Sequence, residues 1–340
     1  MAVTQPNPIR VAVVGTGSLG QHHARIYAEL AAAGTVEFAG VLDHHAERAQ
    51  SFAAKYQTRA FTSIEEAAAH CDALSIVTPT TTHFAVAKQL LELGKDLLIE
   101  KPITDDVARA RELVEIATRN NCLIQVGHIE QFNPVVAYLR TAIAQPRFIE
   151  AQRLSPHPGR GADVGVVLDL MIHDLDIVLS LVKSPVTSVD AVGAAVLSQA
   201  EDLANVRLKF ANGCVAQLTA SRVSAERVRK IRVYQSAPEP LHVSLDFREQ
   251  TASISRVSSD VGATGATVVS EFGGKKIVRE AVPITKEEPL KLELKHFIEC
   301  VRSRQQPLVD GPAAIRALEL ALEITRQIKD DHDGVLRVPY

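Results

Sequence analysis

The amino-acid sequence predicts an α/β fold class with two domains. Through residues 1–127, short apolar runs of strand character alternate with stretches of helical spacing. These runs are apolar without a break, as strands are when helices cover both faces of a parallel sheet. After residue 127, strand patterns separated by turn signals dominate. We therefore expect a doubly wound parallel-sheet domain (1–127) followed by an α+β domain (128–340) with a large, mostly antiparallel open sheet.

The first domain is expected to contain alternating strands and helices. The expected strands span residues 9–15, 36–43, 73–78, 96–100 and 123–127. The expected helices span residues 19–33, 46–57, 63–70, 82–93 and 104–120. Ser63 and Glu66 form a capping box at the start of the third helix, and Gly94 ends the fourth.

The first strand runs directly into a glycine-rich turn, and the second strand ends at Asp43. Strand, G-x-G-x-x-G turn, helix, strand and acidic residue form the order of a dinucleotide site. Gly15 allows the tight turn, Gly17 admits a pyrophosphate, and Gly20 lets helix and strand pack closely. The sequence therefore predicts a Rossmann domain in which the cofactor phosphates meet a helix N-terminus. The expected cofactor contacts in this turn are Gly15, Thr16, Gly17, Ser18, Leu19 and Gly20.

Asp43 also predicts which dinucleotide binds. A carboxylate at this position accepts hydrogen bonds from ribose hydroxyls and repels a 2′-phosphate. His44 and His45 follow instead of the arginines that a phosphate favours, although Arg48 lies one helical turn further on. We expect NAD as the cofactor rather than NADP.

Composition excludes several classes of protein. The chain is 46% apolar and 23% charged, and its net charge of −3 gives no electrostatic reason to expect nucleic acid or an anionic membrane. No apolar run reaches the length of a membrane span, and the N-terminus lacks the pattern of a signal peptide. The four cysteines are scattered, with no C-x-x-C pair and no histidine cluster at zinc spacing. We expect a cytoplasmic protein with reduced thiols and no metal site.

The second domain has a different sequence pattern. Its expected elements are a helix opening at Asn133-Pro134, a strand at 147–154, a long apolar helix at about 164–183, successive strands from 186 to 278, and helices at about 290–304 and 312–329. The Gly-, Ser- and Thr-rich stretch 258–274 reads as a mobile loop. A large open sheet leaves one face bare, and pairing with another subunit is the usual way to cover it. We expect a homodimer or homotetramer.

A polar stripe runs along the expected helix at 164–183. Asp169, His173, Asp176 and Ser180 follow helical spacing beside apolar neighbours, so each buried polar group needs a partner. Carboxylates four residues before and three residues after His173 can set its tautomer, which suits a general acid or base. A hydrogen-bonded core histidine is an alternative that this segment leaves open.

Two further segments lie at expected strand ends of the first domain. Lys101, within Glu100-Lys101-Pro102, is placed to reach the nicotinamide and to donate to a reacting hydroxyl. A solvated surface lysine is the alternative. Thr78, Pro79 and His83 follow the preceding strand, where hydroxyls and backbone groups can line the cofactor. Thr82 in the same turn can equally serve only as a helix N-cap.

Together these motifs resemble the Gfo/Idh/MocA oxidoreductases. The glycine turn, the Thr78-Pro79…His83 turn, Glu100-Lys101-Pro102 and the Asp169-x3-His173-x2-Asp176 helix occur in that family's order, and the resemblance runs from about residue 10 to residue 328. It implies that Lys101 and His173 carry the chemistry with Asp169 beside them. Thr78, Pro79, His83 and Glu100 are then expected to contact the cofactor.

Two segments narrow the resemblance. Residues 126–134 and 165–177 look like the branch of the family that oxidises the 3-hydroxyl of UDP-N-acetylglucosamine to a 3-keto sugar. This branch implies an NAD-dependent dehydrogenase acting on a secondary sugar hydroxyl. Gln131 stands where an arginine is expected, and Met171 stands where many members carry glycine.

A nucleotide-sugar needs cations for its diphosphate, and arginine suits phosphate oxygens. Arg153 and Arg160 flank the loop before the helix of His173, and we expect at least one of them to contact the diphosphate. Nearby strand-like sequence contains Arg222, Arg227, Arg229 and Lys230. His128 and Asp176 are the other expected substrate contacts. An ordinary surface loop with solvated arginines is the alternative.

Other functions also fit the motifs. The chain can act on another sugar or a cyclitol, can be a reductase of a non-sugar resembling biliverdin reductase, or can be a non-catalytic NAD-binding regulator. The presence of both Lys101 and His173 argues against the regulator.

Overall fold

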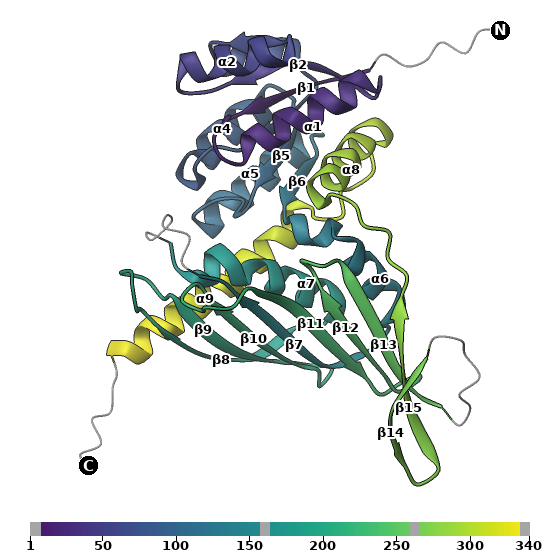
Figure 1. The fold of residues 1–340 in the computed structure, drawn as a ribbon. Coiled ribbons are helices and arrows are strands. Elements are labelled where there is room, and N and C mark those ends of the chain that lie inside the picture. Colours follow the sequence, from purple (N-terminus) through teal and green to yellow (C-terminus); the bar gives the residue numbers. More distant parts are fainter. Residues whose placement is uncertain (1–7, 157–163, 259–265, 334–340) are drawn as a thin grey trace, which may run out of the picture. The chain divides into compact units, whose positions relative to one another are not determined.

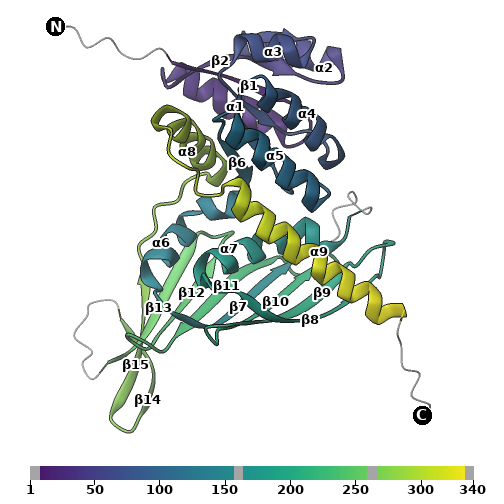
Figure 2. The same ribbon diagram turned by 180° about the vertical axis from the view of Figure 1, so that it is seen from behind.

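The computed structural model describes residues 8–156, 164–258 and 266–333 (Figures 1 and 2). The chain forms two compact units, the first made of Met1–Ile129 with Glu288–Ile315 and the second of Glu130–Glu287 with Arg316–Tyr340. The expected division after residue 127 therefore needs one correction. The segment 288–315, which we expected in the second domain, belongs to the first unit because its helix shares a hydrophobic core with the first strand and helix of the chain.

The first unit is built on a parallel sheet of strand order β3-β2-β1-β4-β5-β6. Its strands are β1 (Ile9–Val14), β2 (Val36–Leu42), β3 (Arg59–Phe61), β4 (Ala73–Ile76), β5 (Asp96–Glu100) and β6 (Ile124–Gly127). Its helices are α1 (Gly20–Ala32), α2 (Ala46–Tyr56), α3 (Ile64–His70), α4 (Thr80–Glu92), α5 (Val107–Arg119) and α8 (Pro289–Ser303). The predicted doubly wound sheet is confirmed, although the short β3 was not predicted.

Helices cover both faces of this sheet. α1, α2 and α8 lie over one face, and α3, α4 and α5 lie in a row over the other (Figures 1 and 2). Val13, Tyr27 and Phe297 share one core, and the Tyr27 hydroxyl lies 2.8 Å from the Ser75 hydroxyl. The strand order reverses between β1 and β4, so the crevice outside the carboxyl ends of these strands is where such a sheet binds its ligand.

The second unit is built on a nine-stranded sheet of order β14-β15-β13-β12-β11-β7-β10-β9-β8. Its strands are β7 (Pro146–Leu154), β8 (Val186–Ala194), β9 (Leu203–Phe210), β10 (Val215–Ser221), β11 (Val228–Gln235), β12 (Leu241–Asp246), β13 (Thr251–Ser258), β14 (Thr267–Phe272) and β15 (Lys275–Val282). Its helical elements are the 3₁₀ turn η1 (Ile129–Phe132), α6 (Pro134–Ala142), the π-helical turn η2 (Val167–Met171), α7 (Ile172–Val182) and α9 (Gly311–Asp333), of which η1 and α9 begin in the first unit. Only β7 and β10 pair in parallel, so the predicted mostly antiparallel sheet is confirmed among the described strands.

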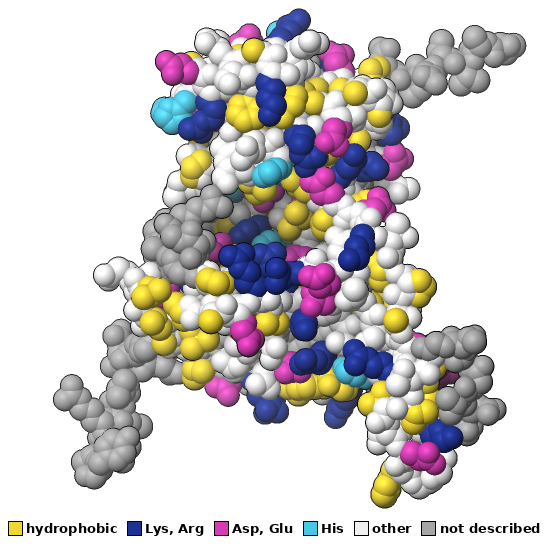
Figure 3. Space-filling view, viewed as in Figure 1, with side chains coloured by type: hydrophobic (Ala, Val, Ile, Leu, Met, Phe, Trp, Pro, Cys, Tyr) yellow, Lys and Arg dark blue, Asp and Glu magenta, His cyan; other side chains and the backbone are white. Residues whose placement is uncertain are grey.

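The two faces of the nine-stranded sheet differ. One face carries α6, α7 and α9 (Figures 1 and 2), and its strand residues form a continuous apolar core with those helices. The opposite face carries polar side chains such as Arg207, Gln217 and Arg232, as the alternation of β9, β10 and β11 requires. Lysine, arginine, histidine and acidic side chains lie side by side on this unit (Figure 3). Water can solvate such a face, so it does not by itself require a partner.

Part of the stretch expected as a mobile loop forms a strand. Within the Gly-, Ser- and Thr-rich stretch 258–274, residues 267–272 form β14 rather than a loop, and residues 259–265 lie outside the described part of the chain.

All four cysteines are free thiols. No helix in the described ranges is long and apolar enough to cross a membrane.

Candidate active site

A pocket of about 940 Å³ opens in the first unit where β1, β2 and β4 end. It lies at the crevice that the strand order marks as the ligand site. Six of the predicted cofactor residues line it, namely Gly15, Gly17, Ser18, Asp43, Thr78 and Pro79. A pocket of this size is in the range that holds drug-sized ligands and cofactors.

The glycine turn is shaped as the sequence predicted. Gly15 has φ +91°, and a Cβ there would lie 2.6 Å from the Val77 carbonyl oxygen. The backbone conformation and the lack of space therefore both exclude a side chain. At Gly20 a Cβ would lie 1.8 Å from the Gly15 carbonyl oxygen. At Gly17 no atom lies within 4 Å of the corresponding position, which leaves the backbone open to an approaching phosphate. Within the described part of the chain, the N-cap Leu19 offers no capping side chain to α1 and the first turn holds no acidic residue, so the N-terminus suits an anion.

Asp43 is held rigidly at the edge of this pocket. Its Oδ2 accepts hydrogen bonds from the Thr16 N–H at 2.7 Å and the Thr16 hydroxyl at 2.8 Å, and its Oδ1 accepts one from the His45 N–H at 2.9 Å. Burial alone would raise the pKa of Asp43, but the hydrogen bonds from His45 and Thr16 outweigh it and lower the pKa. Asp43 is therefore an ionised acceptor, and Oδ1 keeps a lone pair for a ribose hydroxyl.

Lys101 follows directly on β5, and its N–H donates to Glu100 Oε2 at 3.2 Å. The Glu100 side chain is buried, and its Oε1 lies 3.2 Å from Nε2 of the buried His23 on α1. A Cβ at Gly127 of the adjacent β6 would lie 2.8 Å from the Glu100 carboxylate, so glycine makes room for it. Glu100 thus supports the backbone of Lys101 from inside the unit. Sequence reasoning missed His23, although Gly20, His23, Ala24 and Tyr27 follow the spacing of a buried helix face.

The turn after β4 joins two of the predicted cofactor segments. The ring nitrogens of His83 lie 3.0 Å from the Pro102 carbonyl oxygen and 2.9 Å from the Thr78 carbonyl oxygen. His83 is buried and therefore supports the pocket wall from behind. Thr82 is not a helix N-cap, because α4 begins at Thr80. Its hydroxyl instead donates within the turn and faces the pocket.

The second unit carries the other predicted catalytic residues. Asp169 and His173 are half-buried, Asp169 in the π-helical turn η2 and His173 in the first turn of α7. The sequence predicted a regular α-helix here, but the Ile172 N–H reaches back to the Val167 carbonyl, five residues earlier. π-helical turns occur frequently at functional sites. Met171 is fully buried in the core beside this turn.

Asp176 lies on the same helix but has a different environment. It is buried, and its Oδ2 accepts a hydrogen bond from the Gln131 amide nitrogen at 2.7 Å. The same nitrogen lies 3.1 Å from the Ser180 hydroxyl, and Arg140 donates to the amide oxygen of Gln131 at 2.9 Å. Gln131 therefore joins η1 to α6 and α7. His128, the other predicted substrate residue, is buried at the end of β6 in the first unit.

The structure corrects the role expected for Arg153. Its guanidinium is 3% exposed and makes ion pairs with Asp174 at 2.8 Å and Glu130 at 2.9 Å. Burial alone would lower the pKa of Arg153, but these carboxylates outweigh it and raise the pKa, so the group stays charged. An arginine already enclosed by two carboxylates is not available to a diphosphate. Arg160 lies outside the described residues.

The sequence did not predict the carboxylate partners of Arg153, and it did not predict the partner of a second buried arginine. Arg222, considered among the nearby cations, is 1% exposed and binds Asp202 at 2.6 Å rather than facing solvent. No sequence signal identified Glu130 or Asp202 as partners, because each pairs with an arginine about 20 residues away. Within the described ranges, no group of three His, Cys, Asp or Glu side chains is arranged to hold a metal ion.

Comparison with known families decides the relationship. Residues 9–128 match the oxidoreductase family with an NAD-binding Rossmann fold named for Gfo, Idh and MocA, and residues 136–237 match the C-terminal domain of the same group. The chain belongs to the Gfo/Idh/MocA oxidoreductase family. The predictions of an oxidoreductase and of NAD as the family's cofactor are therefore confirmed.

Members of the Gfo/Idh/MocA family align with nearly the whole chain. UDP-N-acetylglucosamine 3-dehydrogenase from Acidithiobacillus ferrooxidans is 38% identical over 317 residues, covering 93% of this chain and 96% of that protein. Its solved structure matches with a TM-score of 0.84 at 36% identity and covers 95% of this chain and 98% of that chain. The NAD(+)-dependent scyllo-inositol 2-dehydrogenase of Bacillus subtilis is 26% identical, covering 95% of this chain and 94% of that protein.

The geometry around Asp43 predicts the effect of its removal on cofactor choice. In Asp43→Ala, we expect NADH to bind about 10- to 100-fold more weakly, since a hydrogen bond to a charged group is worth about 1.5–3 kcal/mol. NADPH should bind as well or better, because Arg48 Nη1, 3.5 Å from Asp43 Oδ2, becomes free for a 2′-phosphate. Fluorescence quenching by both cofactors measures the change, with the exposed Asp105→Ala as a control. Equal binding of NADH and NADPH by the unaltered protein would contradict the role of Asp43.

Proposed function

We propose that this protein is an NAD-dependent dehydrogenase that oxidises the 3-hydroxyl of UDP-N-acetylglucosamine to the 3-keto sugar. The observation that carries the proposal is the relative of that activity, which is 38% identical over 93% of this chain. The dinucleotide pocket and the half-buried pair Asp169 and His173 supply the chemical means.

The residues of the first unit fit NAD. Gly17 leaves space for the pyrophosphate, the positive end of the α1 dipole favours its charge, and Asp43 is preoriented for the adenosine ribose. Bound NAD supplies the hydride acceptor, and this redox chemistry belongs to the cofactor. Thr78 and Pro79 line the same pocket, while His83 and Glu100 hold its walls from behind.

Three side chains are assigned to the reacting hydroxyl. His173 takes the proton of the hydroxyl, and with NAD bound as the hydride acceptor the alcohol would become a ketone. Lys101 donates a hydrogen bond to the same oxygen and stabilises negative charge as it develops. Asp169 orients the substrate and the imidazole. The buried Asp176 is assigned to holding η1 through Gln131, and His128 to shaping the substrate pocket.

A panel of substrates tests the proposal. Purified protein, NAD and each candidate are mixed, and NADH absorbance is followed for UDP-N-acetylglucosamine, UDP-N-acetylgalactosamine, UDP-glucose, free N-acetylglucosamine and myo- and scyllo-inositol. We expect turnover of UDP-N-acetylglucosamine with a kcat/KM at least about tenfold above the rest, since loss of one satisfied polar contact costs about 1–3 kcal/mol. Mass spectrometry of the product should show loss of two hydrogens, and NMR should place the ketone at carbon 3.

The alternative is oxidation of a cyclitol or a free sugar, which the inositol dehydrogenases among the relatives favour. Turnover of inositol with none of any UDP-sugar would reject the nucleotide-sugar and leave the dehydrogenase. Tight NADH binding with no turnover of any candidate would favour a regulator.

The homo-oligomer expected from the sequence is also part of the proposal. The hairpin of β14 and β15 supports it, because its described side chains include the apolar Val269 and Phe272, and Phe272 is 89% exposed. A pocket of about 700 Å³ hollows the polar sheet face and is lined by β11, β12, β13, β15 and this same β14, including Val269. Sedimentation velocity at micromolar protein measures the assembly, and a single 37 kDa species at all concentrations would reject it.

A further inference from the structure

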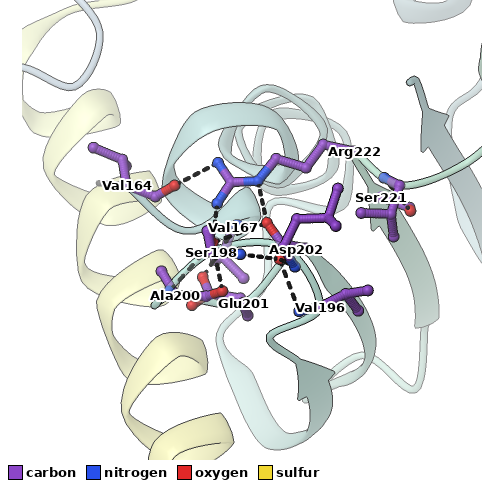
Figure 4. A network of polar contacts seen from close by, with 11 residues as sticks. Val164, Val167, Val196, Ser198, Ala200, Glu201, Asp202, Ser221 and Arg222 are labelled. Carbon is purple, nitrogen blue, oxygen red and sulfur yellow. Dashed lines mark hydrogen bonds and ion pairs between the residues drawn. The ribbon is translucent and has the colours of Figure 1, made fainter. Parts of the chain in front are cut away.

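A second network of buried charges lies where the helix of Asp169 and His173 begins. Asp202 immediately precedes β9 and Arg222 immediately follows β10, and the pairing of Leu203 with Ser221 brings these two residues opposite each other. Both side chains are enclosed, with Asp202 0% and Arg222 1% exposed. The Arg222 Nε donates to Asp202 Oδ1 at 2.6 Å, and this ion pair links the end of β10 to the start of β9 (Figure 4).

Asp202 organises the loop before β9. Its Oδ2 accepts hydrogen bonds from the backbone N–H groups of Val196 at 2.8 Å, Leu197 at 2.6 Å and Ser198 at 2.9 Å (Figure 4). Burial alone would raise the pKa of Asp202, but these N–H groups and Arg222 outweigh it and hold the pKa well below its ordinary value. The carboxylate is therefore ionised, and it fixes the turn that carries Ser198 and Glu201.

The other donors of Arg222 leave this loop and reach the helix start. Its Nη1 donates to the Val164 carbonyl at 2.7 Å, and its Nη2 donates to the Ser198 hydroxyl at 2.9 Å. One guanidinium thus joins the strand end, the loop and Val164, which lies three residues before η2 (Figure 4). The planar fork of arginine can make these three contacts in fixed directions, whereas a lysine ammonium cannot.

Glu201 completes the attachment from the same loop. Its carbonyl accepts the Val166 N–H at 2.8 Å, and its Oε1 accepts the Val167 N–H at 3.4 Å. These are N–H groups of the helix start, which have no partner inside the helix. A Cβ at Gly165 would lie 2.0 Å from Glu201 Oε1, so only glycine lets the carboxylate approach this closely. Arg222 and Glu201 together therefore bond to the backbone of the segment 164–167.

We propose that Arg222, Asp202 and Glu201 are positioning residues that set the place and rotation of η2 and so place Asp169 and His173 for the reaction. Asp169 lies two residues after the segment 164–167, and its N–H bonds to the Gly165 carbonyl at 3.0 Å. A shift of Val164 or Gly165 therefore passes directly to Asp169 and, through the π-helical turn, to His173. Misplacing a reacting group by about 1 Å can cost on the order of 100-fold in rate.

The first test measures the position of His173 without any substrate. Two-dimensional spectra of the full chain labelled with ¹⁵N-histidine report each imidazole, and His173→Gln assigns the signal of His173. In Arg222→Met we expect the His173 signals to move while those of His83, in the first unit, stay in place. Arg10→Met, which removes a more exposed arginine–aspartate pair with Asp72 in the first unit, is the control and should leave the His173 signals unchanged.

The second test measures turnover and rests on the proposed function. In Arg222→Met we expect kcat to fall roughly 10- to 100-fold, with the KM for NAD within twofold. Arg222→Lys should lose as much as Arg222→Met, because it keeps the charge but not the fork. Gly165→Ala should lower kcat by displacing the Glu201 carboxylate.

The outcomes separate this inference from the proposed function. Unchanged His173 signals in a folded Arg222→Met, with kcat within twofold of the unaltered protein, would overturn the inference. If Arg222→Met does not fold, Ser198→Ala removes the hydroxyl that contacts both Arg222 and Asp202 but keeps the ion pair, and it should move the His173 signals by a smaller amount. No movement in Ser198→Ala would overturn the inference equally. Absence of any sugar oxidation by the unaltered protein would reject the proposed function, while the histidine spectra would still decide the inference.

Discussion

Replacing His173 by Gln should lower kcat by about 10²–10⁴-fold, the usual cost of losing a general base. Lys101→Met should lower kcat as well, since it removes the donor to the developing oxyanion. Both variants should bind NADH within twofold of the unaltered protein, because neither side chain lines the dinucleotide pocket. Stopped-flow measurement of NADH formation and fluorescence titration of NADH give the two quantities separately.

The double variant tests whether the two residues act on the same hydroxyl. Groups that act as a unit are strongly non-additive, so Lys101→Met with His173→Gln should cost much less than the product of the single losses. Lys95→Met, at a half-buried position in the turn before β5 that does not line the dinucleotide pocket, is the control and should keep full activity. A His173→Gln protein that is folded and turns over within threefold of the unaltered protein would make the histidine structural.

Replacing Arg153 by Met should destabilise the protein by about 3–5 kcal/mol, because Asp174 and Glu130 would remain buried without their cation. For a unit of this size the loss corresponds to a melting temperature lower by roughly 10 °C. Differential scanning calorimetry measures it. Arg248→Met, at an exposed arginine of the same unit, is the control and should change stability by no more than about 0.5 kcal/mol.

The loss of folding stability in Arg153→Met should become smaller as the pH falls. Burial raises the pKa of Asp174 even in the presence of Arg153, and removal of the arginine raises it further. The penalty is present while the carboxylate is ionised, so it should shrink as the pH falls from about 8 to about 5. Arg153→Met with Asp174→Asn should recover part of the loss. If Arg153 instead bound a diphosphate, the variant would melt normally and lose affinity for UDP.

Local patterns predicted the first unit almost completely. The order of strand, glycine turn, helix, strand and Asp43 is confined to about 35 residues, and the structure places these residues around one pocket. One half of the predicted capping box is formed, since the Ser63 hydroxyl accepts the Glu66 N–H at 3.1 Å, while the Glu66 carboxylate accepts the N–H of Thr62 at 2.8 Å. Such features depend on neighbours within one or two elements, so the sequence alone contains their physical cause.

Side chains that pair across distant elements were predicted poorly. Arg153 looked like a loop cation because the sequence does not show that β7, η1 and α7 enclose it. Gln131 looked like a departure from the family pattern, yet its amide bonds to Asp176 and to Arg140 in two other helices. The π-helical turn at Val167–Met171 also escaped a pattern based on regular helical spacing.

The sequence by itself determined the family, the doubly wound sheet, the dinucleotide turn and the residue types available for catalysis, because glycine conformation, periodicity and helix caps act over short stretches of chain. Only the tertiary structure decided which charges are enclosed and which segment packs where. It placed 288–315 with the first unit, gave Arg153 and Arg222 their carboxylates, and attached the start of η2 to the loop before β9. The physical reason is burial, since a charge removed from water must find a partner and that partner is supplied by packing rather than by neighbours in the sequence.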